Sequence, residues 1–148
     1  MQPPKILPPH YFLLCLALMV GLTFVLEQDL FGSRWVYIGS IPMLVGAALA
    51  ASAARQFSSV GTNIIPLTKS SALVRDGIFA WTRNPMYTGM VLFLAGLAMV
   101  LDNPWNGLLV VAFFLTIRQR FVLREEQLMF ETFGEQYASY KSSVRRWV

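Results

Sequence analysis

The chain has 148 residues, the length of a single domain, and a formal net charge of +4. Hydrophobic residues make up 55% of it and charged residues only 14%, whereas roughly 25% of residues are charged in soluble domains. The apolar residues also gather in long uncharged runs. This composition excludes an ordinary soluble domain and predicts an all-α integral membrane protein.

Cysteine and histidine are too scarce to build a site of their own. Cys15 and His10 are the only residues of their types, so neither an intrachain disulfide nor a Cys/His metal site can form. A basic excess in so apolar a chain is typical of membrane topology and contact with lipid headgroups. No basic tract interleaved with aromatic residues indicates nucleic-acid binding. Membrane lipids are therefore the expected partner, with no metal and no nucleic acid.

Four apolar runs predict four transmembrane helices within one membrane domain, residues 1–148. Residues 1–9 hold four prolines and are expected to be extended. The run from Trp35 to Ala54 is long enough to cross a hydrocarbon core of about 30 Å. A tight turn at 102–104 predicts that the last two runs form an antiparallel hairpin. The expected transmembrane helices cover about 10–26, 35–54, 86–101 and 105–121.

Two polar segments complete the domain. Residues 55–85 are predicted to form a cytoplasmic loop, and loops of this length are often functional. Residues 122–148 are predicted to form a cytoplasmic tail that begins as an amphipathic helix, because charged and apolar residues alternate there with helical periodicity. Gly134 is expected to end that helix.

The distribution of charge predicts the orientation in the membrane. Segments 27–34 and 102–104 hold one basic residue and three acids, while the other eleven basic residues lie elsewhere. Because basic segments stay in the cytoplasm, both termini, Arg83 and the pair Glu125-Glu126 are expected at the cytoplasmic face. Two distant groups of charged residues can then meet there.

A charged, proline-bearing segment runs directly into the third apolar run. Arg83 and Asn84 come just before Pro85, and proline is tolerated at the start of a helix. Tyr87 and Gly89 follow in the first turns. The free N–H groups and dipole of a helix N-terminus favour an anion, and Arg83 is expected beside them. This segment is therefore a candidate ligand site.

The adjacent acids Glu125 and Glu126 form the second candidate. Neighbouring residues on a helix point about 100° apart, so one carboxylate can face inward while the other faces solvent. The alternative is that nearby arginines at 118, 120 and 124 balance these acids on a solvated face. The sequence leaves both interpretations open.

Three tyrosines have two interpretations as well. Tyr87, Tyr137 and Tyr140 are either anchors at the membrane interface or the walls of a pocket for an adenine or a cation. Sequence motifs of soluble enzymes are absent: the chain has no Gly-x-Gly-x-x-Gly, no Walker loop, no His-Glu-x-x-His and no Gly-x-Ser-x-Gly. This excludes a soluble Rossmann-type methyltransferase or dehydrogenase.

Two of these segments resemble a known family. Arg83-Asn84-Pro85-Met86-Tyr87-Thr88-Gly89 resembles the Arg-His-Pro-x-Tyr-x-Gly segment of the isoprenylcysteine carboxyl methyltransferases, which are related to phospholipid N-methyltransferases. Arg124-Glu125-Glu126-x-Leu128, followed by Phe133-Gly134-x-x-Tyr137-x-x-Tyr140, is similar to their C-terminal signature. The clear departure is Asn84, which replaces the family histidine and cannot accept a proton at neutral pH.

The resemblance implies an S-adenosyl-L-methionine-dependent methyltransferase at the cytoplasmic face of a membrane, the inner membrane for a small bacterial-type member. The implied substrate is a lipophilic small molecule or a prenylated protein, with an isoprenylcysteine-type carboxylate as the methyl acceptor. So small a bundle is also a candidate homodimer. Arg83 and Glu126 take the catalytic roles in this prediction. The predicted cofactor-binding residues are Arg83, Asn84, Pro85, Tyr87, Gly89, Glu125, Glu126, Tyr137 and Tyr140.

Two other functions remain open from the sequence. A nicotinamide-dependent membrane reductase would use the same basic face for the phosphates of its cofactor. A non-catalytic membrane binding protein would retain the motifs for folding alone. The identity of the methyl acceptor, and whether oxygen or nitrogen is methylated, are also left open.

Overall fold

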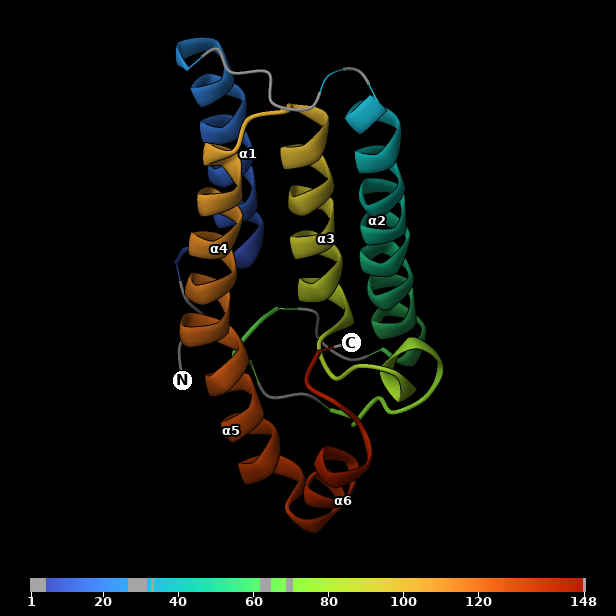
Figure 1. Ribbon diagram of the computed structural model, residues 1–148. Helices are drawn as coiled ribbons and strands as arrows, with labels where there is room; N and C mark the ends of the chain where they lie inside the picture. Colours follow the sequence, from blue (N-terminus) through green and yellow to red (C-terminus); the bar gives the residue numbers. More distant parts are fainter. Residues whose placement is uncertain (1–4, 27–31, 33, 62–64, 69–70, 148) are drawn as a thin grey trace.

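The computed structural model describes residues 5–26, 32, 34–61, 65–68 and 71–147. Within these residues every regular element is helical, which confirms the all-α prediction. Four long helices run side by side, each antiparallel to the next along the chain (Figure 1). They are α1 (Pro8–Val25), α2 (Arg34–Val60), α3 (Pro85–Val100) and α4 (Trp105–Ile117).

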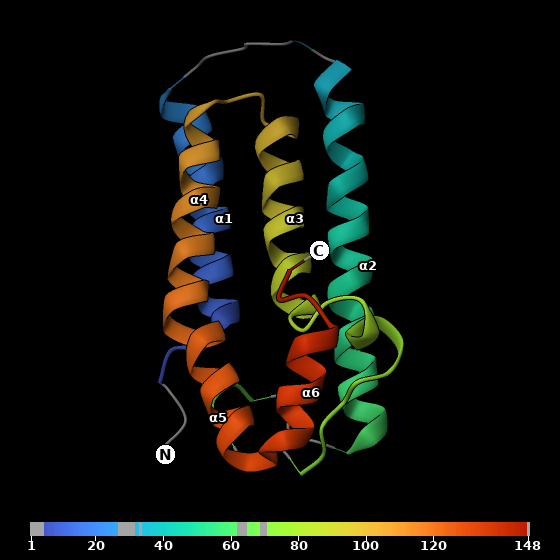
Figure 2. The ribbon, with the colours of Figure 1, turned by 60° about the horizontal axis from the view of Figure 1, so that its bottom comes forward.

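Shorter helices gather at the end of the bundle where α3 begins (Figure 2). A 3-10 turn, η1 (Gly77–Ala80), precedes α3. A π-helical turn, η2 (Arg118–Val122), continues α4 into α5 (Leu123–Phe133), and α6 (Glu135–Ser143) follows. The chain turns from α5 into α6 at Gly134, whose φ of +51° favours glycine.

Three stretches of helix in the described chain are long and apolar enough to span a membrane: Pro8–Val25, Arg34–Ser59 and Trp105–Phe133. The last includes α4, η2 and α5. α3 has only 16 residues, so it is about 24 Å long at the usual helical rise. It lies between α2 on one side and α1 and α4 on the other (Figure 1). The chain is thus an integral membrane protein with a short central helix.

The second helix differs from its expected bounds. α2 continues to Val60, beyond the expected end at residue 54, so the polar segment 55–85 begins inside a helix. Nothing in the intervening sequence interrupts the helix until Gly61, which has a φ of +67°. Glycine in this left-handed conformation is a common helix terminator. Polarity alone was therefore a poor guide to where α2 ends.

Glycines allow the backbones of α2 and α3 to approach each other closely. A Cβ atom added at Gly46 would lie 2.5 Å from the carbonyl oxygen of Gly89 and 2.6 Å from the amide nitrogen of Phe93. Two helical turns away, Gly39 faces Gly96 in the same way. Small residues at facing positions allow close packing between membrane helices. This contact fixes the position of α3, whose first turn carries part of the site.

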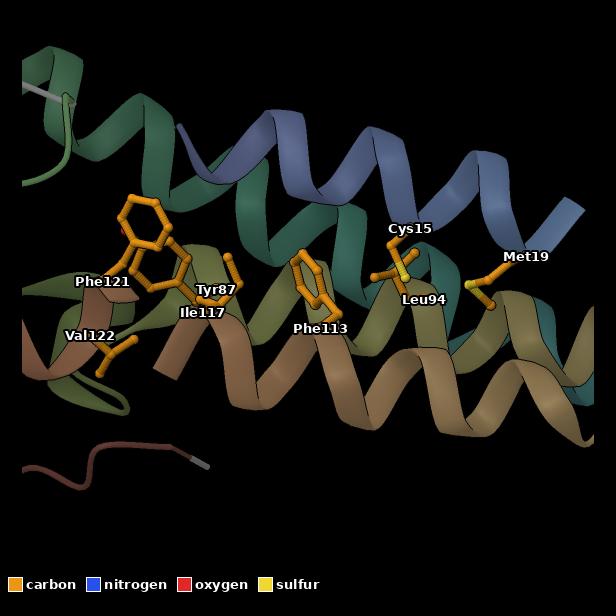
Figure 3. Packing of buried hydrophobic residues seen from close by; sticks show 8 residues of the cluster. All are labelled: Cys15, Met19, Tyr87, Leu94, Phe113, Ile117, Phe121 and Val122. Atoms are coloured by element: carbon orange, nitrogen blue, oxygen red, sulfur yellow. The ribbon is translucent and has the colours of Figure 1, made fainter. Parts of the chain in front are cut away.

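A buried apolar cluster runs along the interior between α1, α3 and α4 (Figure 3). Near the start of α3 it includes Tyr87, whose hydroxyl group reaches from this core to Glu125 at the polar end of the bundle. The core therefore seats one face of the candidate site. Its buried members are Cys15, Met19, Tyr87, Leu94, Phe113, Ile117, Phe121 and Val122.

Candidate functional site

The polar segment before α3 is held by the residues that follow α6. The backbone N–H of Arg83 donates a 2.9 Å hydrogen bond to the carbonyl oxygen of Arg145. The carbonyl oxygen of Arg146 accepts two more, from the hydroxyl of Thr82 and from the side-chain amide of Asn84, each 3.1 Å long. Thr82 and Asn84 are both buried. These bonds fix the segment that carries Arg83.

Glu126 binds two guanidinium groups. Arg146 donates from Nε and Nη2 to the two oxygens of the carboxylate, at 2.7 and 2.8 Å. Nη1 of Arg83 lies 3.0 Å from Oε1 of the same carboxylate. The side chains of Arg83 and Glu126 are only 7% and 8% exposed, and a charge this buried is costly without partners. Because the cluster joins two cations to one anion, it keeps one net positive charge.

Glu125 has neutral partners instead. The hydroxyl of Tyr87 donates a 2.9 Å hydrogen bond to its Oε1, and the backbone amide of Leu67 donates a second bond to the carboxylate. Leu67 has a φ of +59°, an uncommon conformation for a residue other than glycine. Within the described chain no lysine or arginine pairs with Glu125. The carboxyl group of Glu125 is therefore available to a cationic ligand.

Two tyrosines of α6 face the same region. The hydroxyl oxygen of Tyr137 accepts a 3.4 Å hydrogen bond from Nη1 of Arg83. The hydroxyl of Tyr140 donates a 2.6 Å bond to the carbonyl oxygen of Phe79 in η1. Burial raises the pKa of both phenols above the usual value, so both hydroxyls keep their protons at neutral pH.

These groups surround one cavity of about 270 Å³. Its walls come from the first turns of α1 and α3, from the segment before η1, and from α5 and α6. Apolar side chains such as Leu7, Met86 and Met129 supply much of the surface. The polar and charged side chains from the two motifs that line it are Arg83, Asn84, Tyr87, Glu125, Glu126, Tyr137 and Tyr140.

Most of the residues expected at a cofactor site thus meet in one place. Pro85 also lines the cavity, but Gly89 does not. Gly89 faces α2, where an added Cβ would meet the carbonyl oxygen of Gly46 and the amide nitrogen of Ala50. We therefore assign Gly89 to helix packing and do not retain it among the pocket residues.

The two glutamates behave differently from the expectation that one faces solvent. Both line the cavity, because α5 has neighbours on two sides: Tyr87 and Leu67 at Glu125, and the two arginines at Glu126. In the described chain neither glutamate pairs with the arginines at 118, 120 or 124. A merely solvated, self-balanced helix face does not describe this arrangement.

Sequence reasoning missed Arg146 and Leu67. Arg146 lies in the predicted cytoplasmic tail, where nothing marks it as a site residue, yet it makes both hydrogen bonds of a two-pronged pair with Glu126. A buried carboxylate close to a motif requires cationic partners, and that requirement is a signal for a second arginine. Leu67 acts through its backbone, for which its side-chain type gives no signal.

The fold and the site define the class of this protein: it is an all-helical membrane protein with a charged cavity at one end of its bundle. A family model described as phospholipid methyltransferase matches residues 35–136. The chain belongs to this family.

Named relatives agree with the resemblance seen in the two motifs. Human protein-S-isoprenylcysteine O-methyltransferase is 32% identical over 138 residues, covering 86% of this chain and 48% of the relative. The enzyme of the same name from Tribolium castaneum is 31% identical over 110 residues, covering 72% of this chain and 39% of the relative. The chain therefore spans about half the length, or less, of these curated relatives.

A solved structure shares the fold. The eukaryotic intramembrane Ras methyltransferase, isoprenylcysteine carboxyl methyltransferase, superposes with a TM-score of 0.73 at 24% sequence identity. The similarity covers 90% of this chain and 49% of that one. The all-helical membrane architecture is thus common to both proteins.

Proposed function

We propose that this chain is an S-adenosyl-L-methionine-dependent methyltransferase that acts at the cytoplasmic face of a membrane on a lipid-soluble acceptor. The observation that carries the proposal is the meeting of Arg83 and Glu125 at one cavity, where each offers a charge to a ligand. S-adenosylmethionine carries a carboxylate, an ammonium group and a sulfonium. A cavity with both an available cation and an available anion suits such a molecule.

The residues present fit this cofactor. Nε of Arg83 is buried and has no hydrogen-bond partner among the described residues, and a ligand carboxylate matches the geometry of a guanidinium group. Glu125 can face the ammonium or the sulfonium, since no cation of the described chain pairs with it. The rings of Tyr137 and Tyr140 offer faces for an adenine or a cation.

The cofactor, when bound, supplies an electrophilic methyl group. The contribution of the chain is to hold both reactants in line and to exclude water, for which apolar walls such as Met86, Met90 and Leu128 are suited. A carboxylate acceptor is already a nucleophile and needs no base. An amine acceptor requires one, and Glu125 is better suited than Glu126, whose charge is taken up by two arginines.

The acceptor that we propose is an isoprenylcysteine-type carboxylate or a comparable lipophilic molecule. The named relatives are isoprenylcysteine O-methyltransferases, and the cavity has apolar residues at Leu7, Ile65 and Pro66. A chain that spans half of the human relative need not share its protein substrate. A free prenylated cysteine analogue is therefore the first acceptor to test.

The charges of the cavity argue against a nicotinamide dinucleotide. Among the described residues that line it, Arg83 is the one lysine or arginine, and two acidic residues, Glu125 and Glu126, line the same cavity. A pyrophosphate would face as much repulsion as attraction there. The same electrostatic argument favours a ligand that carries charges of both signs.

The test uses the purified protein in lipid nanodiscs. Calorimetry should show binding of S-adenosylmethionine but not of a nicotinamide cofactor, and labelled methyl groups should transfer to the prenylcysteine analogue or to a membrane lipid. Arg83→Gln should weaken cofactor binding, while Arg75→Gln, a change at an exposed arginine that does not line the cavity, should not. Binding of neither cofactor would favour a non-catalytic protein and contradict the proposal.

A further inference from the structure

The residues Val144–Trp147, here called the C-terminal strap, lie outside the matched family region 35–136 and outside the cavity wall. They pass from α6 back toward the start of α3 (Figure 2). The ring of Trp147 packs against Phe114 of α4, with ring centroids 5.0 Å apart. The strap therefore connects α6, α4 and the segment that precedes α3.

Arg146 makes two kinds of contact from this strap. Its backbone carbonyl oxygen holds Thr82 and Asn84, the neighbours of Arg83. Its guanidinium group holds both oxygens of Glu126, and this bond raises the pKa of the arginine further above its already high value. One residue thus fixes both the segment that bears Arg83 and the carboxylate that Arg83 faces.

Arg146 adds a second positive charge beside Glu126, and this charge affects how Arg83 interacts with the carboxylate. Arg83 and Glu126 alone would form a neutral, buried pair, and the carboxylate would draw the whole guanidinium group of Arg83 to itself. Arg146 occupies both oxygens of Glu126 with short bonds, while Arg83 contacts only Oε1 and keeps a buried Nε without a partner. Because Arg146 also binds Glu126, the positive charge of Arg83 is not fully neutralised. Its Nε also remains available as a hydrogen-bond donor.

We propose that Arg146 is a positioning residue that neutralises Glu126 and so keeps Arg83 available to bind the carboxylate of the cofactor. This inference rests on the proposed function, which supplies the anionic ligand. It assigns to the strap a role in ligand selectivity in addition to any role in stability. The ligand selected is one that carries a carboxylate next to an adenosyl sulfur group.

The experiment compares two ligands that differ by this one group: S-adenosylhomocysteine and its decarboxylated counterpart. The wild type should prefer the carboxylate-bearing ligand. Arg146→Gln should lower affinity for S-adenosylhomocysteine by roughly tenfold or more, the scale of one charged hydrogen bond, and should change affinity for the decarboxylated ligand much less. Arg146→Lys should restore part of the preference. Arg145→Gln, a change at the exposed neighbour in the same strap, is the matched control.

A second variant separates charge from structure. In Glu126→Gln/Arg146→Gln both partners lose their charge, so Arg83 again carries an unopposed positive charge and the preference for the carboxylate should return. A purely structural role of Arg146 predicts equal losses for both ligands and no such recovery, which overturns the inference. Wild-type binding of S-adenosylhomocysteine together with unchanged selectivity in Arg146→Gln overturns the inference alone. Failure of the wild type to bind either ligand or S-adenosylmethionine overturns the proposed function too.

Discussion

The hydroxyl group of Tyr87 donates a 2.9 Å hydrogen bond to Oε1 of Glu125 and so joins the first turn of α3 to α5. The bond links the two sequence motifs directly, although 38 positions separate the residues. It also places a carboxylate without a cationic partner in the described chain beside the apolar core. This pair is the clearest point at which the membrane helices and the candidate site depend on each other.

Tyr87→Phe should weaken both stability and ligand binding. The change keeps the ring in the core but removes the side-chain donor from Glu125, and a hydrogen bond contributes about 0.5–1.5 kcal/mol to stability. Thermal unfolding in nanodiscs and calorimetry with S-adenosylmethionine measure the two effects. Tyr37→Phe, at an exposed position of α2, is the control. Equal behaviour of the two variants would show that the bond to Glu125 contributes nothing.

Gly46→Ala should force α2 away from α3. The new methyl group would lie 2.5 Å from the carbonyl oxygen of Gly89, and overpacking of this kind typically costs about 1–3 kcal/mol. Gly21→Ala is the matched control, because no atom of a neighbouring helix lies within 4 Å of the position of its added Cβ. Chemical unfolding of both variants checks the expectation. A Gly46→Ala protein as stable as Gly21→Ala would contradict the close helix contact.

Asn84→His should be tolerated, whereas Asn84→Leu should not. An imidazole N–H can replace the amide donor to the carbonyl oxygen of Arg146, but leucine leaves that contact unmade in a buried position, at a cost of about 1–3 kcal/mol. Thermal unfolding and cofactor affinity measured on both variants test this. Equal losses in the two would mean that volume, and not the hydrogen bond, decides which residue this position accepts.

Alkaline pH should destabilise the end of the bundle that carries the site. Burial raises the folded-state pKa of Tyr137 and of Tyr140, so their contribution to stability is complete below the unfolded pKa of about 10 and is lost as pH rises beyond it. Unfolding measured between neutral pH and strongly alkaline pH should show this fall. The double change Tyr137→Phe/Tyr140→Phe should flatten it, and an unaltered slope would assign the fall to other groups.

Much of this architecture was predictable because it follows from local patterns. Apolar runs fix where helices form, and the proline at 85 and the glycine at 134 mark a helix start and a helix end that the structure confirms. The charged residues of the two motifs were expected to meet, and Nη1 of Arg83 does lie 3.0 Å from Oε1 of Glu126. Buried charged residues require partners of opposite charge. Charged residues in both motifs therefore indicated that the motifs would pair.

The parts that sequence patterns missed depend on distant contacts. Gly89 was assigned to the pocket because it belongs to the motif, but its role depends on which face of α3 meets α2. Arg146 follows the motif residues and gains its meaning only when the strap returns to α3. The inward direction of both glutamates likewise depends on neighbours from three other segments. Tertiary contact decides each case, and no local periodicity encodes it.

The π-helical turn η2 affects the directions in which the side chains of α5 point. A π turn holds one residue more than an α-helical turn needs, and each residue of an α-helix advances the side-chain direction by about 100°. The turn therefore sets the rotational phase of all of α5 relative to α4. If the same residues, Arg118–Val122, formed a regular α-helical turn, α5 would rotate by about 100° and Glu125 would take the direction that Glu126 has now. The π-helical geometry of this turn, as much as the identity of the glutamates, specifies which of them meets the arginines.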